Sequence, residues 1–259
     1  MKKIRIILSG LFKQVRTDLV FSLFIVVLFV FVSFAEKSAR EQVCHEVSIR
    51  IYPENDNRFL DQEDITNNLM TSSGRPLKGL NLSEINTKEL ETGLIRNQFV
   101  ENAEVYFDLA GNLYIDVFHR KPVLRIMSSS GQNYYIDKDG VHMPLSSKHT
   151  VRILIATGFI EKASRNTNFE HQLFKLADFI KRDKFLDALI GQIHIKYDGE
   201  VVLVPKIEDF TIEFGTLDHM EMKFKKLKIF YKRILPFEGW NKYNKVDLRF
   251  SNQIVLNKK

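Results

Sequence analysis

The chain has 259 residues, of which 44% are hydrophobic and 27% charged, a balance typical of folded globular proteins and not of a wholly disordered chain. Its formal net charge is +6. Five of the 38 basic residues precede Asp18, the first acid of the chain, so the remainder offers little positive excess for a nucleic-acid-binding groove.

The first predicted element is an apolar helix over residues 19–35, which contain no charge, proline or glycine. Such a helix rises about 25 Å, near the hydrocarbon core of about 30 Å. Because basic flanks stay in the cytoplasm, we expect residues 1–18 to be a cytoplasmic tail and residues 19–35 a single transmembrane helix. The alternative is a cleaved signal peptide, since Ser33 and Ala35 occupy small-residue positions that a signal peptidase prefers. Both interpretations place the bulk of the chain outside the cytoplasm.

Residues 36–122 predict a small domain of two helices and three strands. A period-two pattern indicates a strand over residues 43–51, Asp61 caps a short helix, and a second helix begins near Asn86. A β-hairpin over residues 105–117 follows. The order strand, helix, helix, strand, strand resembles a POTRA domain, a module found beside membrane-associated assembly machinery.

Residues 123–259 predict a mixed β domain with packed helices, which makes the fold class α+β. Its expected strands cover residues 123–126, 134–145, 151–156, 193–204, 211–214 and 246–256, and its expected helices cover residues 169–190 and 220–234. The run from Asp137 to Gly140 could be a calcium loop or a plain turn. The turn is favoured, because Gly140 is the fourth residue of the run and an EF-hand needs glycine at the sixth.

The helix over residues 220–234 combines an apolar stripe with a basic side. The stripe consists of Met220, Phe224, Leu227, Tyr231 and Ile234, and the side predicted to be exposed carries Lys223, Lys225, Lys226, Lys228, Lys232 and Arg233. Two interpretations stay open. The basic side either docks on anionic lipid headgroups or an acidic partner, or is a solvated face around a core stripe.

The sequence contains no pattern typical of an enzyme. Its seven histidines are scattered without metal-ligand spacing, and no nucleophile elbow, zinc-protease motif or phosphate-binding loop is present. We therefore expect no catalytic residues, metal, cofactor or small-molecule ligand. An exported enzyme whose site converges from distant residues is the alternative.

The arrangement of the parts resembles the FtsQ/DivIB family of bacterial cell-division proteins. A basic tail, one membrane span, a POTRA-like unit that closes in Arg120-x-Pro122, a mixed β domain and a strand reading Val246-Asp247-Leu248-Arg249-Phe250 carry this resemblance. It implies a single-pass inner-membrane scaffold of the divisome, with its N-terminus in the cytoplasm and its domains in the periplasm. It also implies binding to FtsB- and FtsL-like coiled-coil proteins and an influence on septal peptidoglycan synthesis. A POTRA protein of outer-membrane assembly or secretion is the alternative.

The resemblance also implies a partner-binding site, because in this family the strand after the Asp-Leu-Arg tripeptide pairs with an added partner strand. The residues carried over are Arg249, Phe250, Asn252, Gln253 and Ile254. A strand at a sheet edge can accept a partner strand through its unpaired backbone groups. Residues 246–256 could equally form an interior strand, and the sequence leaves both arrangements open.

Overall fold

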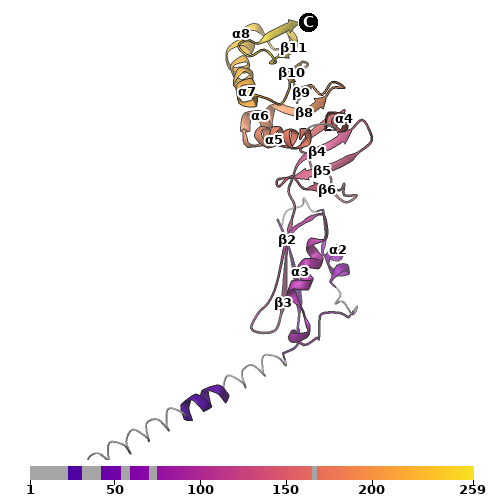
Figure 1. Ribbon diagram of the computed structural model, residues 1–259, viewed down its shortest axis with the longest axis vertical. Coiled ribbons are helices and arrows are strands. Elements are labelled where there is room, and N and C mark those ends of the chain that lie inside the picture. Colours follow the sequence, from indigo (N-terminus) through magenta and orange to yellow (C-terminus); the bar gives the residue numbers. More distant parts are fainter. Residues whose placement is uncertain (1–22, 31–41, 54–58, 70–74, 165–167) are drawn as a thin grey trace, which may run out of the picture. The chain divides into compact units, whose positions relative to one another are not determined.

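The computed structural model describes residues 23–30, 42–53, 59–69, 75–164 and 168–259 (Figure 1). The described chain divides into two compact units. The first contains the described residues up to Arg50 with Gln62–Leu94 and Ala103–Asp116, and the second contains Ile51–Asp61, Ile95–Asn102 and Val117–Lys259.

Residues 23–30, within the predicted transmembrane segment, are helical. In the part of the chain that the structure describes, no helix is long and apolar enough to cross a bilayer. The rest of the predicted span, residues 19–22 and 31–35, lies outside the described residues, as does the predicted tail over residues 1–18.

The predicted order strand, helix, helix, strand, strand is confirmed, with one additional short 3₁₀ helix. The elements are β1 (Val47–Tyr52), α2 (Gln62–Asn68), η1 (Leu82–Glu84), α3 (Thr87–Ile95), β2 (Val100–Phe107) and β3 (Leu113–His119). The strands form a sheet in the order β1-β3-β2, so the hairpin pairs with itself and β1 adds beside β3. Asn86 caps α3 as expected, because its Oδ1 accepts the N–H of Glu89 at 3.2 Å.

A nine-stranded sheet is the centre of the second unit. Its strands are β4 (Pro122–Ser128), β5 (Asn133–Asp137), β6 (His142–Met143), β7 (Leu154–Gly158), β8 (Ile190–Ile195), β9 (Val201–Pro205), β10 (Thr211–Gly215), β11 (Tyr243–Asp247) and β12 (Val255–Lys258). They lie in the order β12-β11-β10-β9-β8-β7-β4-β5-β6. The pairs β4–β7, β7–β8 and β10–β11 are parallel, and the others are antiparallel.

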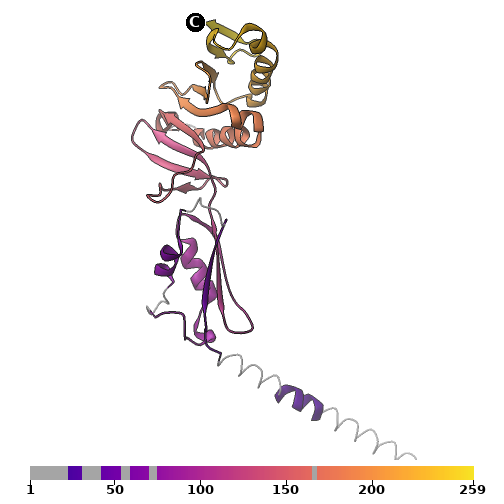
Figure 2. The same cartoon turned by 180° about the vertical axis from the view of Figure 1, so that it is seen from behind.

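Helical crossovers account for two of the parallel pairs. Between β7 and β8 the chain forms α4 (Ile160–Ser164), α5 (Phe169–Arg182) and α6 (Lys184–Leu189), and between β10 and β11 it forms α7 (Met220–Ile229), η2 (Phe230–Ile234) and α8 (Leu235–Glu238). Parallel neighbours need such a long connection, whereas a hairpin would reverse the strand. Figures 1 and 2 show α5 and α7 on the same face of the sheet from both sides.

The helices and the sheet enclose one apolar core. The predicted inner stripe of α5 is confirmed, since Phe169, Leu173, Leu176 and Ile180 are all buried. On α7 the predicted Phe224 and Leu227 are buried. The π-helical turn η2 then allows the consecutive residues Phe230 and Tyr231 both to face the core.

One residue of the predicted basic side is buried. Lys223 is only 7% exposed, its Nζ donates to the carbonyl of Thr216 at 2.7 Å, and the ammonium lies 4.8 Å from the ring centroid of Phe214. The segment between β10 and α7 covers this part of the helix. Burial consequently lowers the pKa of Lys223.

The run from Asp137 to Gly140 forms a turn. Asp137 Oδ1 accepts the backbone N–H groups of Asp139 at 2.9 Å and Val141 at 2.8 Å, while its Oδ2 accepts from Arg120 Nη1 at 2.8 Å. The carboxylate is thus satisfied by the protein itself, and Arg120 of the Arg-x-Pro motif has a definite partner. Among the described residues no group of three or more His, Cys, Asp or Glu could hold a metal ion.

Candidate functional site at the C-terminal sheet edge

The last strand, β12, lies at one end of the nine-stranded sheet, with β11 as its one neighbour among the described residues. In Figure 1 this end of the sheet is yellow and lies beside the C-terminus. The strand β11, by contrast, is paired on both sides, with β10 and with β12. A strand with one neighbour leaves a row of backbone N–H and C=O groups that another chain can bind.

The register of β12 identifies which backbone groups face outward. The strand runs antiparallel to β11, with Leu256 opposite Val246. The N–H of Lys259 donates to the carbonyl of Lys242 at 3.1 Å, so the odd-numbered residues of this strand direct their backbone groups toward β11. Because an antiparallel ladder alternates, the N–H and C=O groups of Leu256 and Lys258 face the open edge.

The residues predicted to bind a partner lie in the connection between β11 and β12, outside the strand ladder. They are Arg249, Phe250, Asn252, Gln253 and Ile254. The prediction of one continuous strand over residues 246–256 is wrong, because the chain turns at residues 250–252 and returns as β12. The connection gathers the five residues in one loop, where Phe250 is 46% exposed and Ile254 packs partly against the core. Their role in binding stays a prediction.

A side chain from α7 holds this connection. Lys226 Nζ donates to the carbonyl oxygens of Leu248 at 2.8 Å, Gln253 at 3.4 Å and Phe250. One ammonium thus satisfies three carbonyls that the end of β11 leaves outside the ladder. Partial burial lowers the pKa of Lys226. The helical pattern predicted that Lys226 lies on a solvated face. The contact with this loop could not be predicted, because the periodicity of a helix carries no information about a loop that comes later in the chain.

Arg249 is fixed by two acids and by a glycine. Its Nη2 donates to Asp247 Oδ2 at 2.7 Å, its Nε donates to Asp247 Oδ1 at 3.0 Å, and its Nη1 donates to Glu200 Oε2 at 3.1 Å. The side-chain stem passes close to Gly215, whose φ is +76° and where an added Cβ would lie 2.7 Å from Arg249 Cγ. Glycine is therefore required here by both the backbone conformation and the close approach.

Two buried carboxylates lie beside each other beneath Arg249. The parallel pairing of β10 and β11 places Glu213 opposite Asp247, and the two residues are 4% and 6% exposed. Two carboxylates at paired strand positions repel each other, but neighbouring cations compensate for this repulsion. Lys196 Nζ lies 2.6 Å from Glu213 Oε2, Lys245 Nζ lies 3.2 Å from Glu213 Oε1, and Arg249 pairs with Asp247.

The cations keep both acids ionised. Burial alone would raise the pKa values of Glu213 and Asp247, but hydrogen bonds and charges from Lys196, Lys245 and Arg249 outweigh it and lower both. Glu213 alternates with the core residues Ile212 and Phe214, so this charged network lies on the sheet face away from the helices. Nothing in the local pattern of β10 distinguishes Glu213 from an ordinary exposed strand residue.

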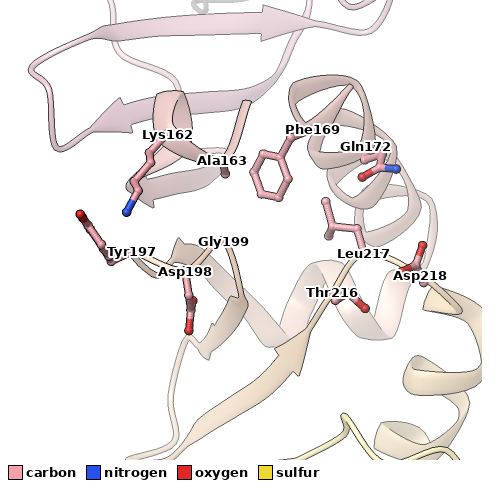
Figure 3. A pocket seen from close by; sticks show the side chains of 10 residues that line it. All are labelled: Lys162, Ala163, Phe169, Gln172, Tyr197, Asp198, Gly199, Thr216, Leu217 and Asp218. Atoms are coloured by element: carbon pink, nitrogen blue, oxygen red, sulfur yellow. The ribbon is translucent and has the colours of Figure 1, made fainter. Parts of the chain in front are cut away.

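A pocket of about 390 Å³ lies elsewhere in the second unit (Figure 3). Lys162 and Phe169 line one side, and Tyr197 and Asp218 line the other, with Tyr197 at the outer margin. A hydrogen bond and the charge of Lys162 lower the pKa of the exposed Tyr197. The described lining contains no His, Cys or Ser.

Comparison with known proteins gives two matches that together cover most of the chain. Residues 121–256, more than half of the chain, match the family model described as FtsQ/DivIB, C-terminal related. Residues 42–118 match the model described as a POTRA-like domain. None of the curated proteins matches the chain.

Proposed function

Because the chain belongs to the FtsQ/DivIB family of POTRA-containing cell-division proteins, we propose that it is a scaffold of the bacterial divisome that works by binding other division proteins. The proposed partners are FtsB- and FtsL-like coiled-coil proteins, through which the scaffold helps to control septal peptidoglycan synthesis. It carries out no catalysis of its own.

The observation that carries this proposal is the position of β12 at the end of the sheet. The outward backbone groups of Leu256 and Lys258 offer two N–H donors and two C=O acceptors to an added strand. The chain immediately before β12 is held by a hydrogen bond from Lys226, by a hydrogen bond to Asp247 and by close packing of Arg249 on Gly215. Little ordering of this segment is therefore needed when a partner binds. Preorganisation of this kind favours a stable complex.

The five residues carried over from the family flank this ladder. In the proposal Phe250, with its half-exposed ring, contacts apolar side chains of the partner where the partner extends beyond β12. Arg249 already uses its donors on Asp247 and Glu200, so it contributes mainly by shaping the loop and by its positive charge. Asn252, Gln253 and Ile254 complete the surface between the turn and the strand.

The proposed architecture follows the family, whose members are anchored in the membrane. Residues 1–18 form a cytoplasmic tail, residues 19–35 an inner-membrane helix, residues 36–122 a POTRA-like domain and residues 123–259 the C-terminal β domain, both in the periplasm. A fluorescent fusion of the full chain should therefore accumulate at midcell in dividing cells. Uniform fluorescence around the cell, or recovery in the outer membrane, would contradict this assignment.

Strand addition is tested at Lys258, whose side chain is exposed and whose N–H faces outward. Lys258→Pro removes that donor without removing a bond to β11, and the matched control Lys258→Ala removes the side chain but keeps the donor. Copurification of the full chain with the FtsB-like partner should be lost in the proline variant and retained in the alanine variant. Equal capture by both variants would show that the edge is not used.

A further inference from the structure

We propose that a groove between α5 and α7 is a second docking site and that it binds an acidic amphipathic helix of a partner protein. The groove has a volume of about 550 Å³. Its floor is formed by Phe179, Phe224 and Ile229, and cations on its rim include Lys225, Lys232 and Arg233. None of its lining belongs to β11, β12 or the loop between them, so the inference goes beyond the proposed strand edge.

The floor of the groove is a preformed apolar surface. Phe179 of α5 stacks on Phe224 of α7 with ring centroids 5.2 Å apart and an interplanar angle of 9°. Ile229 is 42% exposed, although it lies between the buried residues Leu227 and Phe230 in the sequence. Phe224 is itself buried, so Ile229 and the partly buried Phe179 provide the apolar surface that a partner's side chain would remove from water, which favours binding.

The charged lining of the groove is mainly basic, because four cations stand against a single acid, Glu221. Within the described part of the chain, no hydrogen bond or ion pair is made by the side chains of Lys225, Lys232 or Arg233, all of which are exposed. Lys228 also lines the groove, but it pairs with Asp183 and lowers the pKa of that carboxyl. Lys225 lies on α7 and Lys232 on η2, and both line the groove, so cations from two successive helical segments face it.

The π-helical turn contributes to this arrangement. Because Phe230 and Tyr231 both turn inward, the next two residues, Lys232 and Arg233, both remain on the outer side. The rim therefore gains two adjacent cations at the end of the groove. Neighbouring like charges on a helix repel one another, and carboxylates of a partner relieve that repulsion.

A helix is the occupant that fits this combination of shape and charge. A concave surface with an apolar floor accepts the apolar ridge of an amphipathic helix, with anchors at positions i, i+3, i+4 and i+7. Asp or Glu residues flanking that ridge at one-turn spacing come opposite the rim cations. A lipid surface is flat and would leave the concave floor uncovered.

The test places a photo-crosslinking amino acid, p-benzoylphenylalanine, at Ile229 of the full chain in its native host. We expect an adduct whose crosslinked peptide, identified by mass spectrometry, is an amphipathic helical segment with acidic flanks. Adding Lys225→Glu and Lys232→Glu should reduce the adduct by about tenfold or more, since two favourable charge contacts become repulsive. The pair Lys225→Arg and Lys232→Arg should retain it.

A matched control makes the same change in net charge at exposed lysines outside the groove, through Lys88→Glu and Lys121→Glu. This control should crosslink normally. An adduct with lipid, an adduct with a peptide lacking acidic residues, an adduct insensitive to the charge reversal, or no adduct would each overturn the proposal. Capture of the FtsB-like partner through β12, measured in the same cells, should persist in the groove variants, which separates this test from that of the strand edge.

Discussion

The contact of Lys226 with the loop before β12 leads to a quantitative prediction. Lys226→Met keeps the length and the apolar stem of the side chain but removes the ammonium that three carbonyls accept from. The carbonyls of the exposed residues Phe250 and Gln253 can bind water instead. The carbonyl of Leu248, a buried residue, lies in a partly buried hydrogen bond and loses its donor.

The expected cost is that of one unsatisfied buried acceptor, about 1–3 kcal/mol. Since about 1.4 kcal/mol corresponds to a tenfold change in an equilibrium constant, the loop should open about ten times more often, or more. The core residues of α7 are untouched, so the change should be confined to the C-terminal hairpin.

Hydrogen exchange of the full chain in detergent, followed by mass spectrometry, measures this effect. Peptides that cover residues 248–258 should exchange about tenfold faster in Lys226→Met, while peptides from α5 and β8 should not change. Lys225→Met is the matched control, because Lys225 is the adjacent residue and is exposed without a side-chain partner among the described residues. Identical exchange in the two variants would refute the assigned role of Lys226.

Three further predictions concern the same site. Gly215→Ala should lower the free energy of unfolding by about 1–2 kcal/mol more than Gly131→Ala in a denaturant titration, because both glycines have positive φ but only Gly215 faces Arg249; equal losses would contradict this. Glu213 and Asp247 have pKa values lowered by folding, so their stabilisation is complete above the unfolded pKa values of about 4 and is lost as the pH falls through the folded values. Thermal melts should therefore be constant from pH 7 to about 5 and fall below about pH 4, and Glu213→Gln with Asp247→Asn should flatten that fall; an unchanged acid profile would exclude these two acids as its cause. Phe250→Ala should weaken capture of the FtsB-like partner about tenfold without changing the unfolding free energy by more than about 0.5 kcal/mol, whereas undiminished capture would remove Phe250 from the interface.

The first unit could be predicted from sequence because its signals are local. A capping Asn86, alternating strands and a hairpin turn each act within a few residues, and the structure confirms their order. The sheet order of the second unit could not be predicted in this way. Its parallel pairs depend on where the helical crossovers return the chain, and the periodicity of a single strand does not contain that information.

The C-terminal hairpin shows why a correct pattern can give a wrong element. Apolar residues alternate from Val246 to Leu256, and both ends do pack toward the core, so the pattern is typical of one strand. The turn between them carries Ser251 and Asn252, which are common in turns, but it has no glycine or proline to interrupt the strand pattern. Its stability depends instead on Asp247, which accepts the N–H of Arg249 at 3.0 Å, and on the distant Lys226.

The length of β12 limits what strand addition can contribute to binding. Its outward residues, Leu256 and Lys258, offer four backbone hydrogen bonds, each with a net value of about 0.5–1.5 kcal/mol, or about 2–6 kcal/mol together. Association itself costs about 4–15 kcal/mol in lost translational and rotational freedom. The ladder alone therefore gives at most very weak binding, although a short edge has the advantage of resisting unwanted pairing between copies. Side-chain contacts must supply the difference, and the exposed ring of Phe250 beside β12 is where we expect the partner to make the first of them.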